Sequence, residues 1–198
     1  MYDFILRGGI VVDGTGKSGF QADVAIKDGK VAEIAATIAG AAKEVIDVTG
    51  LVVAPGFIDI HSHSDTVFLQ DNRCEGKLYQ GVTTEVAGQC GSTIYPCPDD
   101  RMDNIRGFAG SALQDFASSS FQEFMDKVKA QGKQMSTNLI SLIGHGALRC
   151  GVMGYENRKA TPEELAEMGR LLERDMQAGA WGLSLGLGYT PGISSDQE

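Results

Sequence analysis

Long apolar runs, clusters of basic residues and cysteine-rich motifs are all missing from this sequence of 198 residues. No apolar stretch approaches the roughly 18 residues that suggest a membrane span. The N-terminus, Met1-Tyr2-Asp3, lacks the basic segment of a signal peptide. The net charge of −9 argues against nucleic acid or an anionic membrane as a partner, because both reward clustered lysine and arginine. We therefore expect a cytoplasmic protein that binds neither nucleic acid nor membrane.

Cysteine is also scarce, with four residues in the chain: Cys74, Cys90, Cys97 and Cys150. They form no CxxC pair, and they are too sparse for a disulfide scaffold. A reducing compartment fits this usage and leaves free thiols available as metal ligands. Glycine, in contrast, is in excess at 26 residues, which predicts many tight turns.

The first 54 residues are predicted to form a small β-domain. Short apolar segments alternate with glycine-containing turns, and the candidate strands are Phe4–Leu6, Ile10–Val12, Asp23–Ile26, Lys30–Ile34 and Glu44–Val48. Asp28-Gly29 between two of these segments is a strong signal for a two-residue hairpin. We expect the sheet to be antiparallel.

From Pro55 onward the pattern changes to strands that alternate with helices, which is typical of an α/β fold with parallel strands. The predicted strands are Phe57–Ile60, Val82–Ala87, Asn138–Ile143 and Trp181–Leu187, and the predicted helices lie near Glu75–Gln80, over Phe121–Ala130 and between Thr161 and Gly179. Residues 55–198 therefore form a second domain of about four strand–helix units.

Two of these helices have clear start signals. Ser120 is a plausible N-cap for the first, and Thr161, Pro162 and Glu164 supply a capping box with proline at the first helical position of the second. In the second helix, apolar residues recur at helical spacing, and we expect that face to pack inward. These residues are Leu165, Met168, Leu172 and Met176.

The most informative segment runs from Asp59 to Asp65 and contains His61 and His63. Side chains alternate along a strand, so the two histidines would point the same way and could share a divalent ion such as Zn²⁺. Asp59 and Asp65 fall on that face if the strand persists, and either could orient a ligand. The alternative is that two of the three histidines are neighbours in a solvated loop.

Reactive residues also follow the later strands. Cys90 lies in a glycine-flanked turn after the second strand, His145 follows the third, and Tyr189 follows the fourth. Taken singly, they are better explained as a buried cysteine, a satisfied histidine and a turn tyrosine. Their repetition matters because the C-terminal strand ends of (β/α)₈ barrels form the active-site face. A thiolate at Cys90 is a good zinc ligand.

Several motifs together resemble one family. Ala54–His63 looks like the first barrel strand of the amidohydrolase superfamily, and the first 54 residues resemble the small domain that precedes that barrel. The remaining motifs are similar to the N-acyl-D-amino-acid deacylase (D-aminoacylase) branch: Gly81–Thr84, Gly88–Gly91, Gly144–Arg149, Val152–Gly154 and Gly182–Gly192.

The resemblance implies a metal site in the first half, about four βα units, of a TIM-like (β/α)₈ barrel. His61 and His63 would form one metal position, and Cys90 would help to hold a tightly bound Zn²⁺; a second, weaker site stays open. Asp59, Asp65, His145, Arg149 and Tyr189 are candidates for supporting the ligands or contacting substrate. No catalytic residue is expected within the chain, because the family's general-base aspartate would lie beyond Glu198.

The implied reaction is zinc-dependent hydrolysis of the amide bond of N-acyl-D-amino acids, with the 198 residues inactive alone. One alternative is a cyclic-amide hydrolase of the hydantoinase or dihydroorotase kind, which would usually use a bridging carboxylated lysine; no lysine in the predicted strands has a comparable place. The other is a non-catalytic scaffold with the same fold. Half a barrel would leave sheet edges open, which favours a homo-oligomer.

Overall fold

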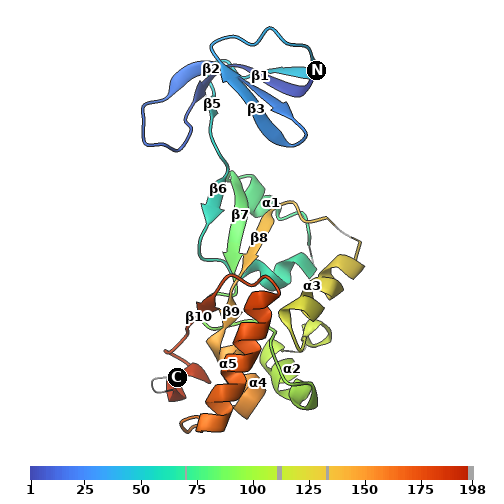
Figure 1. Ribbon diagram of the computed structural model, residues 1–198, viewed down its shortest axis with the longest axis vertical. Coiled ribbons are helices and arrows are strands. Elements are labelled where there is room, and N and C mark those ends of the chain that lie inside the picture. Colours follow the sequence, from blue (N-terminus) through green and yellow to red (C-terminus); the bar gives the residue numbers. More distant parts are fainter. Residues whose placement is uncertain (70, 111–112, 133, 196–198) are drawn as a thin grey trace. The chain divides into compact units, whose positions relative to one another are not determined.

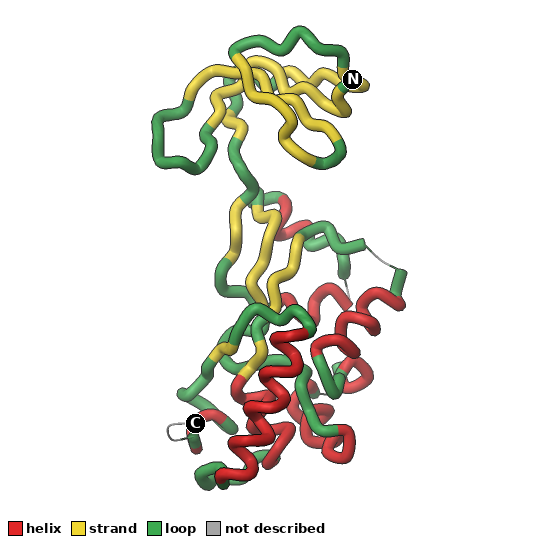
Figure 2. The backbone as a smooth tube through the Cα atoms, viewed as in Figure 1, coloured by secondary structure: helices red, strands yellow, loops and turns green. Residues whose placement is uncertain are grey.

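The computed structural model describes residues 1–69, 71–110, 113–132 and 134–195. The chain divides into two compact units, Met1–Gly56 and Phe57–Glu198, which are considered separately below. Strands build the first unit, and the second contains all the helices of the described residues (Figure 2). None of the helices in the described ranges is long and apolar enough to cross a membrane.

The first unit is a mixed β-sheet rather than the antiparallel sheet that the sequence predicted. Its strands are β1 (Tyr2–Val11), β2 (Phe20–Lys27), β3 (Lys30–Ala35), β4 (Ala42–Asp47) and β5 (Val52–Val53). The order is β3-β2-β1-β4, with β5 also paired to β1 (Figure 1). β1 pairs antiparallel with β2 but parallel with both β4 and β5, because the chain crosses over before β4 and then continues along the same edge of β1 into β5. The antiparallel prediction is therefore wrong for β4 and β5.

Of two predicted glycine-containing turns in this unit, the structure confirms one and replaces the other with a bulge. The Asp28-Gly29 hairpin is confirmed: both residues have positive φ, 51° and 72°, and Lys27 pairs with Lys30. The two short strands predicted on either side of Gly8-Gly9 are instead one strand, β1, whose register with β2 shifts between Leu6 and Gly9. The glycine pair marks a bulge and not a turn.

The second unit has parallel strands, as the sequence predicted. β6 (Phe57–Asp59), β7 (Val82–Ala87) and β8 (Asn138–Ser141) form a sheet in that order, and β9 (Ile143–Gly144) pairs with β10 (Leu183–Ser184). The predicted strand Val82–Ala87 is confirmed. The strand predicted over Asn138–Ile143 divides into β8 and β9, and the one predicted over Trp181–Leu187 contains only the two residues of β10.

Helices and short helical turns connect these strands. The α-helices are α1 (Glu75–Leu78), α2 (Met102–Ala109), α3 (Phe121–Ala130), α4 (His145–Met153) and α5 (Pro162–Gln177), and the 3₁₀ turns are η1 (Ser64–Leu69), η2 (Asp99–Arg101), η3 (Gln114–Phe116) and η4 (Gly192–Ser194). The predicted start signals are confirmed. The Ser120 side chain accepts a hydrogen bond from the Glu123 amide, and the capping box between Thr161 and Glu164 is complete.

The buried face of α5 differs from the predicted one. Met168 is buried as expected, but Leu165 and Met176 are 38% and 44% exposed, whereas Leu171 and Asp175 are fully buried. The buried side of α5 includes Asp175 because this carboxylate accepts a hydrogen bond from the amide of Phe121 at the start of α3. Leu171 joins a core shared by α3, α4 and α5, around the buried ring of Tyr95.

Candidate metal centre

His61 and His63 lie just past the end of β6. The strand stops at Asp59, so the expectation that the strand itself carries both histidines is wrong. The Asp59 carboxylate accepts a hydrogen bond of 3.1 Å from the His61 amide. The side chains nevertheless alternate: both histidines are exposed, while Ser62 and Ser64 are buried. The two imidazole rings lie edge to face with their centroids 5.7 Å apart.

Cys90 approaches this histidine pair from the end of the neighbouring strand. It lies three residues beyond β7 in a left-handed backbone conformation with φ 56°, between glycines that also have positive φ. This conformation costs a non-glycine residue about 1–2 kcal/mol. The turn brings the Cys90 Sγ to 3.3 Å from the His61 Nε2.

The donor atoms fit a zinc ion. The ligand atoms of His61, His63 and Cys90 all lie within 4.8 Å of one another. Tetrahedral zinc with two nitrogen ligands and one sulfur ligand requires donor separations of about 3.3–3.6 Å. The pair of His61 and Cys90 meets this value at 3.3 Å, and the third donor, from His63, lies within 4.8 Å of both. Among the described residues, this is the one cluster of three or more His, Cys, Asp or Glu side chains that could hold a metal.

The other thiols are poor ligands. Cys74, Cys97 and Cys150 are buried, whereas Cys90 is partly exposed. Burial raises the pKa of each buried thiol, that of Cys97 to about 11, so their thiolate forms are disfavoured. Cys90 is the cysteine whose position suits metal binding.

Four contacts hold the turn that carries Cys90. The Ser184 hydroxyl in β10 accepts a hydrogen bond of 3.0 Å from the Gly91 amide and donates one to the Gly88 carbonyl. The Tyr189 hydroxyl donates to the carbonyl of Cys90 itself. At the start of α4, the Ala147 amide donates to the Gly91 carbonyl. Sequence reasoning named Tyr189 for substrate contact and missed Ser184, whose partners are more than 90 residues away.

Asp59 and Asp65 occupy different surroundings. Asp59 forms an ion pair with Lys77, and this contact, together with the His61 amide, lowers the pKa of its carboxyl. Asp65 is 4% exposed in η1, and desolvation raises its pKa to about 6. It lines a cavity of about 170 Å³ together with His63. Asp59 therefore supports the backbone before the first histidine, whereas Asp65 lies beside the second.

Glu85 in the middle of β7 was not singled out in the sequence, yet it is fully buried directly beneath the histidine segment. Ser62 and Ser64 both donate hydrogen bonds to its carboxylate. The sequence did offer one indication of its role, because Glu85 is a charged residue inside a predicted strand. A buried charge is costly unless it is well paired.

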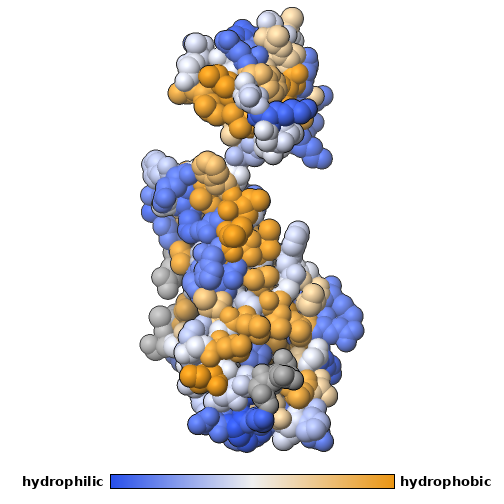
Figure 3. Space-filling model, turned by 90° about the vertical axis from the view of Figure 1, so that its left-hand side faces the viewer, coloured by the Kyte–Doolittle hydropathy of each residue, from blue (hydrophilic) through white to orange (hydrophobic). Residues whose placement is uncertain are grey.

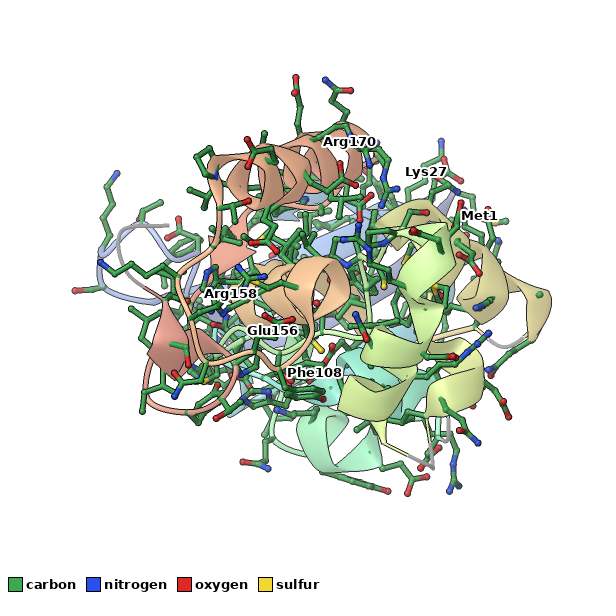
Figure 4. All side chains as sticks on the ribbon, turned by 90° about the horizontal axis from the view of Figure 1, so that it is seen from below. Met1, Lys27, Phe108, Glu156, Arg158 and Arg170 are labelled. Carbon is green, nitrogen blue, oxygen red and sulfur yellow. The ribbon has the colours of Figure 1, made fainter. Side chains whose placement is uncertain are left out.

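His145 and Arg149 are buried in α4, apart from the three-residue cluster. The Arg149 guanidinium donates to the backbone carbonyls of Glu156 and Arg158. The side chains of Glu156 and Arg158, both labelled in Figure 4, form an ion pair with each other. Arg149 thus supports the loop between α4 and α5, and a contact with substrate stays a prediction.

Comparison with known proteins reveals clear relatives. Residues 44–197 match the Amidohydrolase family. The chain is 36% identical over 202 residues to a D-aminoacylase of Alcaligenes xylosoxydans xylosoxydans, and the match covers 100% of the chain and 40% of that relative.

Two solved structures resemble the whole chain. One, from work on the binuclear metal centre of D-aminoacylase, superposes with a TM-score of 0.87 at 34% identity and covers 99% of this chain and 41% of its own. The other is an N-acyl-D-glutamate deacylase from Bordetella bronchiseptica complexed with zinc and a phosphonate inhibitor, with a TM-score of 0.85 at 32% identity and coverage of 98% and 40%. The chain therefore spans about 40% of the length of the curated relatives it matches.

Proposed function

Because the chain belongs to the amidohydrolase family, we propose that it supplies the first metal ligands of an enzyme that hydrolyses N-acyl-D-amino acids. The observation that carries the proposal is the cluster of His61, His63 and Cys90 at the ends of two adjacent parallel strands. The relatives named D-aminoacylase and N-acyl-D-aspartate deacylase, at 36% and 35% identity over nearly the whole chain, support the choice of substrate class.

The proposed fold of the whole protein is a (β/α)₈ barrel, with residues 1–54 as the β-domain before it and 55–198 as its first part. Parallel pairing of β6, β7 and β8 in chain order supports a barrel, since consecutive βα units place neighbouring strands in this way. The ligands then lie at the C-terminal strand ends, where barrel enzymes build their active sites. We place the protein in the cytoplasm, where its four cysteines remain free thiols.

The chain's own residues have distinct roles in the proposed reaction. His61 and His63 offer imidazole nitrogens, and Cys90 offers its sulfur. Zinc held by them would supply Lewis-acid polarisation of the scissile carbonyl. Asp59 and Glu85 hold the backbone on which the histidines lie. The general base, an aspartate on the family pattern, is proposed to lie outside these 198 residues.

The cyclic-amide alternative receives no support from Lys77, which contacts the aspartate just before the histidine segment. Lys77 lies in α1, and its ammonium pairs with Asp59 and lies 3.5 Å from Glu85. It is therefore held by carboxylates beneath the histidine segment and is not available as a carboxylated bridge between metals.

The test is an assay of the whole protein for release of free amino acid from N-acetyl-D-methionine and from its L-isomer, with and without added zinc. We expect zinc-dependent turnover of the D-isomer. Cys90→Ala should lower kcat/KM at least about 100-fold if the thiolate is a zinc ligand. Loss of a residue that merely orients a ligand already costs up to about 100-fold in metal affinity or activity. Cys74→Ala, a cysteine outside the cluster, is the matched control and should stay within about twofold of the wild type.

Two outcomes would contradict the proposal. Preference for the L-isomer would remove the D-aminoacylase assignment and leave the family alone. Absence of any amide hydrolysis in the zinc-loaded whole protein would favour the non-catalytic scaffold instead.

A further inference from the structure

The segment from His61 to Ser64 presents its side chains alternately to two environments. His61 and His63 face the metal cluster, while Ser62 and Ser64, only 5% and 7% exposed, point into the protein. The serines thus flank His63 on both sides. Whatever holds the two serine hydroxyls also fixes the backbone that carries this ligand.

A single carboxylate holds both hydroxyls. Ser62 and Ser64 donate to the same oxygen of Glu85, Oε2, at 2.9 Å and 2.6 Å. Glu85 projects from the centre of β7 and has no exposed surface. The contact therefore links the histidine segment after β6 to the strand that leads to Cys90.

Glu85 is in turn held on its other side. Thr137 donates to Oε1 at 3.0 Å, and the Lys77 ammonium lies 3.5 Å from Oε2 while it also pairs with Asp59. Burial raises the pKa of Glu85, but the hydrogen bonds from Ser64, Ser62 and Thr137 and the charge of Lys77 more than offset burial, and the pKa lies below its usual range. The carboxylate is thus ionised and its oxygens are committed to fixed donors.

From this arrangement we infer that Glu85 is a positioning residue for the metal centre: by holding Ser62 and Ser64 it fixes the histidine ligands in place before the metal binds. The inference rests on the proposed zinc site at His61, His63 and Cys90. Ligands held in advance bind a metal without an ordering cost, and partners that orient ligands typically contribute 10–100-fold to metal affinity. Glu85 is not a member of the metal cluster, so it acts on the ligands through the residues that it holds, chiefly the two serines.

A buried carboxylate elsewhere in the same unit provides a matched control. Asp175 in α5 is also fully buried, and it accepts hydrogen bonds from the Phe121 amide and the Arg174 guanidinium. It is not a member of the metal cluster. Loss of its charge therefore tests the effect of a damaged buried polar network without disturbing the histidine segment.

The experiment measures zinc affinity of the whole protein by competition with a chromophoric chelator. Glu85→Ala is expected to weaken zinc binding 10–100-fold. Glu85→Gln keeps an acceptor oxygen for the serines and should fall between Glu85→Ala and the wild type. Asp175→Asn should lower the urea unfolding midpoint but leave zinc affinity within about twofold of the wild type.

Cobalt provides a second readout that loss of stability alone does not change. In protein saturated with Co²⁺, the visible spectrum reports the geometry of the histidine and thiolate ligands. The spectrum should change in Glu85→Ala and remain that of the wild type in Asp175→Asn. If Glu85→Ala does not fold, the double variant Ser62→Ala, Ser64→Ala removes the same link and is expected to give the same loss of affinity and the same spectral change.

The outcomes separate this inference from the function it rests on. Wild-type zinc affinity and an unchanged cobalt spectrum in the folded Glu85 or serine variants, with His61→Ala abolishing binding, would overturn the role of Glu85 and leave the metal site intact. Zinc binding that His61→Ala does not weaken would overturn the site itself and the inference with it.

Discussion

At the scale of single residues, the candidate centre depends on how a strained cysteine is held. Cys90 adopts positive φ, and the side chain of its neighbour Gln89 holds the turn to the backbone carbonyl of Ile60. Further contacts come from distant residues, because Ser184 and Tyr189 bind the backbone of the turn. The position of the thiol is therefore determined largely by residues that do not contact it.

Substitution of Ser184 tests this dependence. Ser184→Ala leaves the Gly91 amide and the Gly88 carbonyl without their buried partner, so the turn should loosen and zinc affinity should fall about tenfold, measured by chelator competition. Ser118→Ala is the control, since Ser118 is also buried but donates to the Phe116 carbonyl within its own turn. Equal zinc affinities in the two variants would refute the dependence on Ser184.

The sequence revealed the candidate ligands better than their supports. His61, His63 and Cys90 stood out because histidine and cysteine are rare here and follow strand ends. Glu85 and Ser184 carry no such mark. Their roles arise from pairing with residues 21 to 96 positions away, and nothing in their own neighbourhoods indicates which partners the fold brings to them.

At the scale of elements, local start signals were the most reliable predictors. The caps at Ser120 and Thr161 depend on contacts three residues apart, which sequence alone specifies. In contrast, α4 begins immediately after β9 and has no side-chain cap, and it was not predicted. The inward face of α5 was misjudged because a buried aspartate, Asp175, takes a position that apolar periodicity assigns to solvent.

The capping box of α5 should give a distinct dependence of stability on pH. Hydrogen bonds from Arg158, and then from the Thr161 amide, lower the pKa of Glu164 from 4.5 to about 2. A carboxyl whose pKa is lower in the folded state stabilises the fold above pH 4.5, and this contribution is lost as the pH falls toward 2.

Arg158→Met should therefore lower the free energy of unfolding at pH 6, by a small amount because the pair is near the surface. The difference from the wild type should shrink as the pH falls from 4.5 toward 2, as followed by urea unfolding. Glu164→Gln, which preserves the capping box, should remove this pH dependence. A difference at pH 2.5 as large as at pH 6 would contradict the assignment.

At the scale of the whole molecule, one face of the second unit is strongly apolar. Phe57, Ile58 and Ile60, in and just beyond β6, are 59–74% exposed. Trp181, just before β10, is 72% exposed, and Leu183 in β10 is 42% exposed. Figure 3 shows apolar side chains over this part of the unit. β6 also ends its sheet, with no partner strand on its outer side among the described residues. An edge and a face of this kind are normally covered in a folded enzyme.

The 198 residues produced alone are therefore expected to bind zinc, to self-associate and to lack turnover. The described ligands provide three donors, and no general base is assigned among them. Loss of general acid–base catalysis alone typically costs 10²–10⁴-fold. Light scattering and the N-acetyl-D-methionine assay check this, and robust turnover abolished by Cys90→Ala would show that the chain holds the complete catalytic machinery.

The contacts that hold the histidine ligands and those that hold the cysteine ligand also differ in the number of residues that separate the two partners. Glu85 captures the histidine segment across 21 to 23 residues, whereas Ser184 and Tyr189 capture the Cys90 turn across 93 to 99. Closing the longer loop costs more chain entropy and requires the chain to be synthesised through Tyr189. The histidine segment is thus held by contacts that are closer in sequence than those that position the thiol, so the two halves of the cluster depend on very different lengths of ordered chain.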